Sequence, residues 1–129
     1  MAERRKILVA DDESSIREIL SIQLARMGYE VLLAADGVEA VEVYEQEKPD
    51  LVILDVMMPR VNGLEACQKI RAFEKKIGRR APILFLTARD STHDKTSAAL
   101  SGGDEFVAKP VSLQELRERV EAALKKGRP

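Results

Sequence analysis

The sequence predicts an α/β protein, a single doubly wound (βα)5 domain built around a five-stranded parallel sheet. Five short apolar runs alternate with longer segments that have helical spacing, which gives a strand followed by a helix five times. The stronger runs contain four apolar residues without alternation, as is typical of strands buried on both faces of a parallel sheet. Right-handed crossovers would connect these strands. The runs are 7–10, 31–34, 51–54, 83–86 and the weaker 106–108.

The first two helices are predicted from residues that cap helix ends. Ser15 and Glu18 have the spacing of a capping box, and Gly28 follows where a C-terminal glycine is expected. Asp36 and Glu39 repeat the capping pattern at the start of the next helix. Apolar residues recur three or four positions apart within both segments, so each helix would bury one face.

The other three helices are predicted in the same way. A third follows Gly63, with apolar residues at intervals of three, and a short fourth spans about 94–100. Ser112 and Glu115 begin the fifth, whose apolar residues form one stripe. The basic residues between 69 and 80 are interpreted as the solvated end of the third helix.

The composition limits the classes of protein. The 129 residues fit one domain, for which we expect a charged extension at 1–5, the folded domain at 6–124 and a basic tail or start of a linker at 125–129. The net charge of -1 gives no overall attraction to nucleic acid. With one histidine and with Cys67 as the only cysteine, an internal disulfide and a His- or Cys-rich metal site are excluded, and Cys67 is expected in the core.

Neither a signal peptide nor a membrane span is apparent. The charged N-terminus lacks the apolar region of a signal peptide, and no apolar run approaches the roughly 20 residues of a membrane helix. We therefore expect a cytoplasmic domain that binds neither membranes nor nucleic acid directly.

Polar side chains follow four of the five predicted strands. Asp11 and Asp12 follow the first strand, Asp55 the third, Thr87 the fourth and Lys109 the fifth. Because the carboxyl ends of parallel strands meet at one edge of the sheet, these side chains are expected in one crevice. Three carboxylates at close range repel each other, and a hard divalent cation such as Mg²⁺ relieves that repulsion.

An aspartate beside Mg²⁺, a lysine and a hydroxyl group can accept a phosphoryl group. A carboxylate oxygen can attack phosphorus and form an aspartyl-phosphate. The charge on the transferring group would be stabilised by the cation and by Lys109, and Thr87 would donate a hydrogen bond to one of its oxygens.

These residues together resemble the receiver domain of two-component response regulators. The resemblance covers about residues 6–124 and implies a flavodoxin-like strand order of 2-1-3-4-5. It also implies a signalling switch rather than a metabolic enzyme. The matching residues are Asp11-Asp12, Asp55 in the segment Leu54-Asp55-Val56-Met57-Met58-Pro59, Thr87-Ala88 and Lys109-Pro110.

The resemblance implies a role for each matching residue. Asp55 would be the phosphorylation site, with the phosphoryl group coming from a histidine kinase or a phosphotransfer protein. Asp12 and Asp55 would ligate Mg²⁺ or Mn²⁺ directly, together with the backbone carbonyl of Met57, and Asp11 would act through water. Lys109 would pair with the phosphoryl group.

Thr87 and the Ala88 N–H would donate hydrogen bonds to the same phosphoryl group, according to this resemblance. A cis peptide is expected between Lys109 and Pro110. Met57 and Arg89 flank the path of the attacking water in this family, which predicts slow self-dephosphorylation here.

The switch implied by the resemblance involves Thr87 and Phe106. Phe106 would turn inward when Thr87 moves toward the phosphoryl group, although a simple core phenylalanine remains the alternative. The surface formed by the fourth helix, fifth strand and fifth helix would then bind partners or a second copy of the domain, giving a homodimer. The resemblance leaves open whether an output domain follows residue 129.

Three other functions fit the sequence less well. Residues 102–106 spell GGDEF, the signature of diguanylate cyclases, but such a domain is longer than this chain. A haloacid-dehalogenase-type phosphatase needs a second aspartate two residues after its nucleophile, where this chain has Met57. A receiver-like module that is never phosphorylated usually lacks one of the acidic or lysine residues, all of which are present here.

Overall fold

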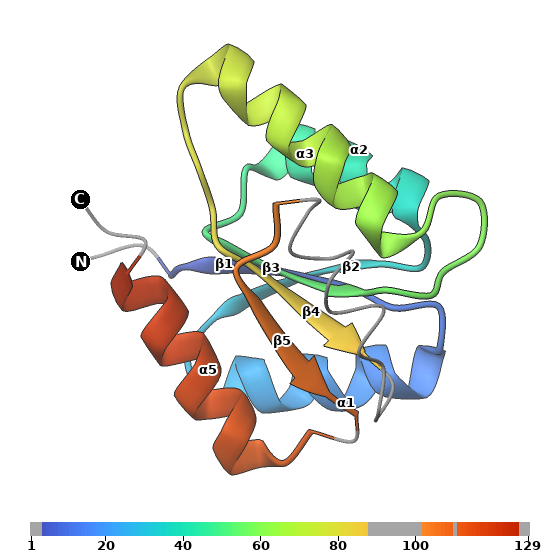
Figure 1. Ribbon diagram of the computed structural model, residues 1–129. Coiled ribbons are helices and arrows are strands. Elements are labelled where there is room, and N and C mark those ends of the chain that lie inside the picture. Colours follow the sequence, from blue (N-terminus) through green and yellow to red (C-terminus); the bar gives the residue numbers. More distant parts are fainter. Residues whose placement is uncertain (1–3, 88–101, 110, 127–129) are drawn as a thin grey trace.

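The computed structural model describes residues 4–87, 102–109 and 111–126 (Figure 1). Within them, five strands form one sheet in the order β2-β1-β3-β4-β5, and all neighbouring strands are parallel. The predicted sheet and strand order are thus confirmed, while the helix predicted at 94–100 lies outside the described residues. The elements are β1 (Lys6–Ala10), α1 (Ser14–Arg26), β2 (Glu30–Ala34), α2 (Gly37–Glu47), β3 (Leu51–Asp55), α3 (Gly63–Ile77), β4 (Ile83–Thr87), β5 (Glu105–Ala108) and α5 (Leu113–Lys126).

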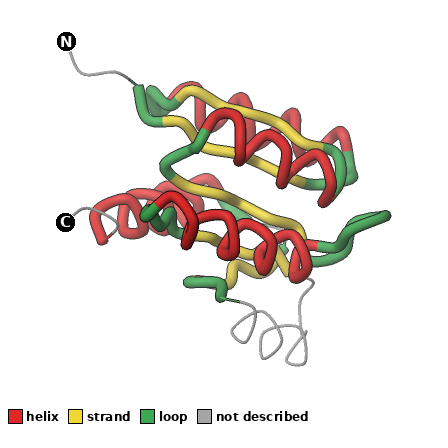
Figure 2. Tube along the Cα trace, turned by 90° about the horizontal axis from the view of Figure 1, so that it is seen from above, coloured by secondary structure: helices red, strands yellow, loops and turns green. Residues whose placement is uncertain are grey.

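Helices cover both faces of the sheet. Figure 1 shows α2 and α3 on one face and α1 and α5 on the other, and Figure 2 shows the same arrangement after a 90° turn. Alternate residues of β1 enter two separate core clusters: Leu8 packs with α2 and α3, and Val9 packs with α1 and α5. The central strand β3 is buried along its whole length. Burial on both faces explains why these strands are continuous apolar runs rather than alternating ones.

Most of the predicted helix ends are confirmed. Asp36 accepts a hydrogen bond from the Glu39 N–H at 2.8 Å, and Ser112 accepts one from the Glu115 N–H at 3.0 Å. Gly28 follows Met27, the C-cap of α1, and has a φ of 97°, a conformation that favours glycine. These caps determine where α1 ends and where α2 and α5 begin.

The predicted capping box at the start of α1 is wrong. The helix begins at Ser14, its N-cap is Glu13, and no side chain caps it. The reason lies in the preceding turn, where Asp11 Oδ1 accepts a hydrogen bond from the Glu13 N–H at 3.0 Å. This bond closes the turn early, so that Ser15 is already inside the helix.

Among the described residues, none of the helices has the length and apolar character that a membrane crossing needs.

Candidate functional site

The predicted carboxylates come together at the carboxyl ends of β1 and β3. These strands are neighbours and pair Ala10 with Leu54, so Asp11 and Asp55 lie side by side at the edge of the sheet. Asp11, Asp12 and Asp55 each offer an oxygen within 4.8 Å of the other two. Asp11 is fully buried, Asp55 is 5% exposed and Asp12 is exposed.

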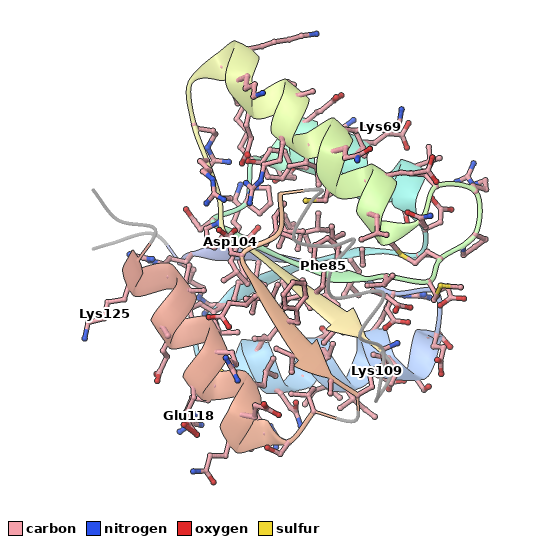
Figure 3. The ribbon with its side chains drawn as sticks, in the orientation of Figure 1. Lys69, Phe85, Asp104, Lys109, Glu118 and Lys125 are labelled. Carbon is pink, nitrogen blue, oxygen red and sulfur yellow. The ribbon has the colours of Figure 1, made fainter. Side chains whose placement is uncertain are left out.

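Lys109 joins this group from the end of β5. Its Nζ lies 3.1 Å from Asp11 Oδ2 and 3.3 Å from Asp55 Oδ1. Figure 3 shows Lys109 just beyond the carboxyl end of β5, at the same edge of the sheet. We call Asp11, Asp12, Asp55 and Lys109 the acidic site; all four were predicted from the sequence to meet here.

The acidic site has more negative than positive charge. Burial and, to a smaller extent, the neighbouring Asp11 charge raise the pKa of Asp55 to about 6 against the opposing effect of Lys109. Burial lowers the pKa of Lys109, but hydrogen bonds and charges from Asp11 and Asp55 outweigh this and raise it overall. One ammonium therefore faces three carboxylates, which leaves an excess of about two negative charges.

The donor set fits a hard divalent cation. Apart from the Lys109 ammonium, no described group satisfies the buried Asp11 Oδ2. Mg²⁺ prefers oxygen ligands, keeps several waters and typically binds one or two carboxylates. The exposed Asp12 leaves one side of the cluster accessible to such waters.

The structure describes the other predicted site residues only in part. Thr87 ends β4 and pairs with Ala108, at the same edge as Asp55, but its side chain is not described. Met57 is 70% exposed, and its N–H donates to Asp55 Oδ1 at 3.4 Å. Phe106 stacks on Phe85 with ring centroids 6.4 Å apart, which fits a core phenylalanine in this conformation, and its inward rotation stays a prediction. Ala88, Arg89 and Pro110 lie outside the described residues.

One residue at the acidic site was missed by the sequence interpretation. Arg17 in α1 donates from Nη1 to the Asp11 carbonyl at 2.7 Å and so holds the end of β1 against α1. A lone arginine in the second turn of a helix gives no motif from which this contact could be predicted.

The GGDEF string lies at the opposite edge of the sheet from the acidic site. Asp104 pairs with Arg71 at 2.8 Å and with Arg80 at 2.7 Å, and Glu105 pairs with Arg119 at 2.8 Å. The two acidic residues of the string are therefore engaged in ion pairs that hold β5 to its surroundings.

Comparison with known families assigns the chain. The family described as the response regulator receiver domain matches residues 7–121. The chain belongs to this family. As a receiver domain, it is a signalling domain of two-component systems.

Individual relatives agree with this assignment. Response regulator MprA of Mycobacterium leprae is 44% identical over 124 residues, which is 96% of this chain and 53% of that protein. Chemotaxis protein CheY4 of Vibrio cholerae has a TM-score of 0.86 and 32% identity, covering 94% of this chain and 99% of that one. The chain spans about half the length of the curated relatives it matches.

A third similar protein bears on the metal. The receiver domain of sensor histidine kinase PA1611 from Pseudomonas aeruginosa has a TM-score of 0.86 and 31% identity, covering 95% of this chain and 99% of that one. Its structure is described with a magnesium ion coordinated in the active site cleft. Receiver domains bind Mg²⁺ in such an acidic pocket, and this chain has the corresponding cluster of carboxylates.

Proposed function

We propose that this receiver domain accepts a phosphoryl group on Asp55 in a reaction that depends on Mg²⁺ or Mn²⁺. The observation that carries the proposal is the position of Asp55, whose Oδ1 lies 3.3 Å from Lys109 while its carboxylate borders Asp11 and Asp12. Asp11 is fully buried and so cannot meet a donor. Asp55 keeps 5% of its surface exposed, and it lies beside a lysine and two carboxylates.

The proposed reaction follows from these neighbours. An Asp55 oxygen attacks phosphorus, the bond from phosphorus to the donor's nitrogen breaks, and that nitrogen takes up a proton. Lys109 pairs with the phosphoryl oxygens, and Thr87 and the Ala88 N–H donate hydrogen bonds to them. A bound cation would offset charge on the carboxylates and the transferring group. Asp12, Asp55 and the Met57 carbonyl would hold the cation, and Asp11 would hold it through water.

We extend the proposal to the biological setting. The phosphoryl donor is a histidine kinase or a phosphotransfer protein, and the phosphorylated domain acts as a switch without metabolic or diguanylate cyclase activity. The cytoplasmic domain spans 6–124, although α5 itself continues to Lys126. The surface around β5 and α5 binds partners or a second copy, and nucleic acid is not bound directly.

The test uses a small phosphodonor. Wild-type protein incubated with acetyl phosphate and Mg²⁺ should gain one acid-labile phosphate, detected by mass spectrometry, and Asp55→Asn should gain none. Asp50→Asn is the matched control, because Asp50 precedes the same strand and bonds to the Lys6 N–H at the other edge. Uptake by Asp55→Asn at the wild-type rate would contradict the assignment.

A further inference from the structure

The loop that follows Asp55, residues 56–62, is held against the end of its own strand. The Gly63 N–H donates to the Val56 carbonyl at 2.9 Å. A Cβ added at Gly63 would lie 2.1 Å from the Asp55 carbonyl oxygen, so only glycine permits this approach. The first residue of α3 is therefore in backbone contact with the residue proposed to be phosphorylated.

The middle of the same loop is held by the first turn of α2. Arg60 donates to Asp36 Oδ2 from Nε at 3.2 Å and from Nη2 at 2.5 Å. The other oxygen of Asp36 caps α2 by accepting from the Glu39 N–H. That hydrogen bond, followed by the one from Arg60, lowers the pKa of Asp36, so the carboxylate stays ionised. A Cβ added at Gly37 would lie 1.8 Å from the Val61 carbonyl oxygen. Side-chain and backbone contacts thus join α2 to the loop at adjacent positions.

The backbone of Arg60 is in an unfavourable conformation. Its φ is 64°, and among the described non-glycine residues only Lys48 also has a positive φ. Glycine adopts this left-handed conformation at a lower energetic cost than other residues, because it has no Cβ to be crowded. Glycine could not make the contact with Asp36, so the ion pair here depends on a side chain attached to a strained backbone.

We infer that Asp36 and Arg60 are positioning residues that hold the 56–62 loop and thereby set the affinity of the acidic site for a divalent cation. The inference rests on the proposed function, in which the loop brings the Met57 carbonyl to the cation. Met57 itself is largely exposed, so its side chain does little to fix the loop from within. Its backbone N–H makes one long hydrogen bond, to Asp55 Oδ1 at 3.4 Å, and beyond it the loop is held by the contacts at Gly63, Arg60 and Val61.

Because the two residues have opposite charges, an effect on cation affinity that comes from positioning the loop can be distinguished from one that comes from long-range electrostatics. Loss of the Arg60 charge alone would strengthen cation binding, and loss of the Asp36 charge alone would weaken it. If the pair acts by positioning the loop, both losses weaken binding. The expected effect is two- to fivefold, because exposed ion pairs contribute modestly.

The experiment measures Mg²⁺ affinity by NMR titration for Arg60→Gly, Asp36→Asn and the double variant. Asp36→Asn retains an oxygen that can cap α2, and Arg60→Gly relieves the backbone strain. We expect each single variant to bind Mg²⁺ two- to fivefold more weakly than wild type, and the double variant to be no weaker than the singles. Hydrogen exchange of the amides at 57 and 58 in metal-free protein should be faster in all three.

Lys48→Gly is the matched control, because it relieves the same kind of backbone strain at the end of α2. It should leave the Mg²⁺ affinity unchanged. An unchanged affinity in Arg60→Gly, or opposite shifts in the two single variants, would overturn the inference. Phosphate uptake by wild-type Asp55 is measured separately, so failure of the proposed function is distinguishable from failure of the inference.

Discussion

Two polar clusters lie at opposite ends of the same sheet, and they differ in how completely their charges are paired. Figure 3 shows Lys109 at the carboxyl end of β5 and Asp104 at its amino end. Lys109 belongs to the acidic site described above. We call the second cluster the amino-end network; its members are Tyr44, Arg71, Glu74, Arg79 and Asp104.

The amino-end network satisfies a buried carboxylate completely. Glu74 is 2% exposed, and its Oε1 accepts from Arg71 Nη1 at 2.7 Å. Its Oε2 accepts from the Tyr44 hydroxyl and from the Ala81 N–H at 2.7 Å. Each oxygen of this carboxylate therefore has at least one hydrogen-bond donor.

Arg71 connects Glu74 to the start of β5. It donates to the Gly102 carbonyl at 3.0 Å, to the Ala81 carbonyl at 2.7 Å and to Asp104 Oδ2 at 2.8 Å. Asp104 Oδ2 also accepts from the Ile83 N–H at 2.8 Å, next to the pairing of β4 with β5. Such a paired network fixes the structure, whereas the acidic site keeps an excess of negative charge that a divalent cation would offset.

The largest expected effect follows from removing the centre of the amino-end network. Arg71→Ala leaves the buried Glu74 charge without its ion-pair partner, which should lower the free energy of unfolding by about 3–5 kcal/mol. Urea denaturation of the variant and wild type measures this. Arg80→Ala is the control, because Arg80 is largely exposed and its hydrogen-bond partner among the described residues is Asp104 alone, so it should cost less than about 1 kcal/mol. Equal losses in the two variants would contradict the comparison.

At the acidic site, removing the Asp55 charge should raise the free energy of unfolding instead of lowering it. The pKa of Asp55 is about 6 in the folded protein, above its ordinary value of 3.8, so the folded state binds the proton more tightly. The contribution of Asp55 to stability therefore falls as pH rises from about 4 to 6 and stays low above pH 6. In metal-free protein, Asp55→Asn should match wild type near pH 4 and exceed it by on the order of 1–3 kcal/mol at pH 7.5.

Parallel urea denaturation of the two proteins at several pH values measures this effect. If the wild type stays at least as stable as Asp55→Asn across the whole pH range, burial and the neighbouring charges do not destabilise the ionised Asp55, and the prediction is wrong.

A smaller effect distinguishes the carboxylates from each other. Asp12→Ala should weaken Mg²⁺ binding more than Asp11→Ala, because Asp12 is proposed to touch the ion directly and Asp11 to act through water. Binding of Mg²⁺ also stabilises the folded state, by about 1 kcal/mol when the free concentration is a few times the dissociation constant. Mg²⁺ titrations followed by thermal unfolding give both quantities, and equal losses in the two variants would overturn the ranking.

The acidic site could be predicted from the sequence, and the amino-end network could not. Asp11, Asp55 and Lys109 follow apolar runs directly, and the ends of parallel strands meet by geometry. Glu74, by contrast, lies in a stretch interpreted as a solvated helix end, yet it is buried. Its partners are the Ala81 N–H, the Tyr44 hydroxyl from α2, 30 residues away, and Arg71, an i,i+3 neighbour that also pairs with Asp104 before β5. The Arg71–Glu74 spacing alone is common on exposed helix faces and does not indicate the contacts with Tyr44 and Asp104.

Helix starts show a similar limit. Asp36 was identified correctly because its side chain bonds within its own helix. The prediction that Ser15 caps α1 is wrong, because the Asp11 side chain, besides lying in the acidic site, also closes the turn before α1. One side chain with two roles cannot be recognised from spacing alone.

The most direct test makes the same chemical change in both clusters. Asp55→Asn and Glu74→Gln each replace a buried carboxylate by an amide, and their free energies of unfolding are compared in metal-free protein at pH 7.5 by urea denaturation. The account predicts opposite signs: Asp55→Asn stabilises the fold, and Glu74→Gln destabilises it by about 2–4 kcal/mol, because an amide cannot accept all of the donors now facing Glu74. Destabilisation of similar size in both variants would contradict the account.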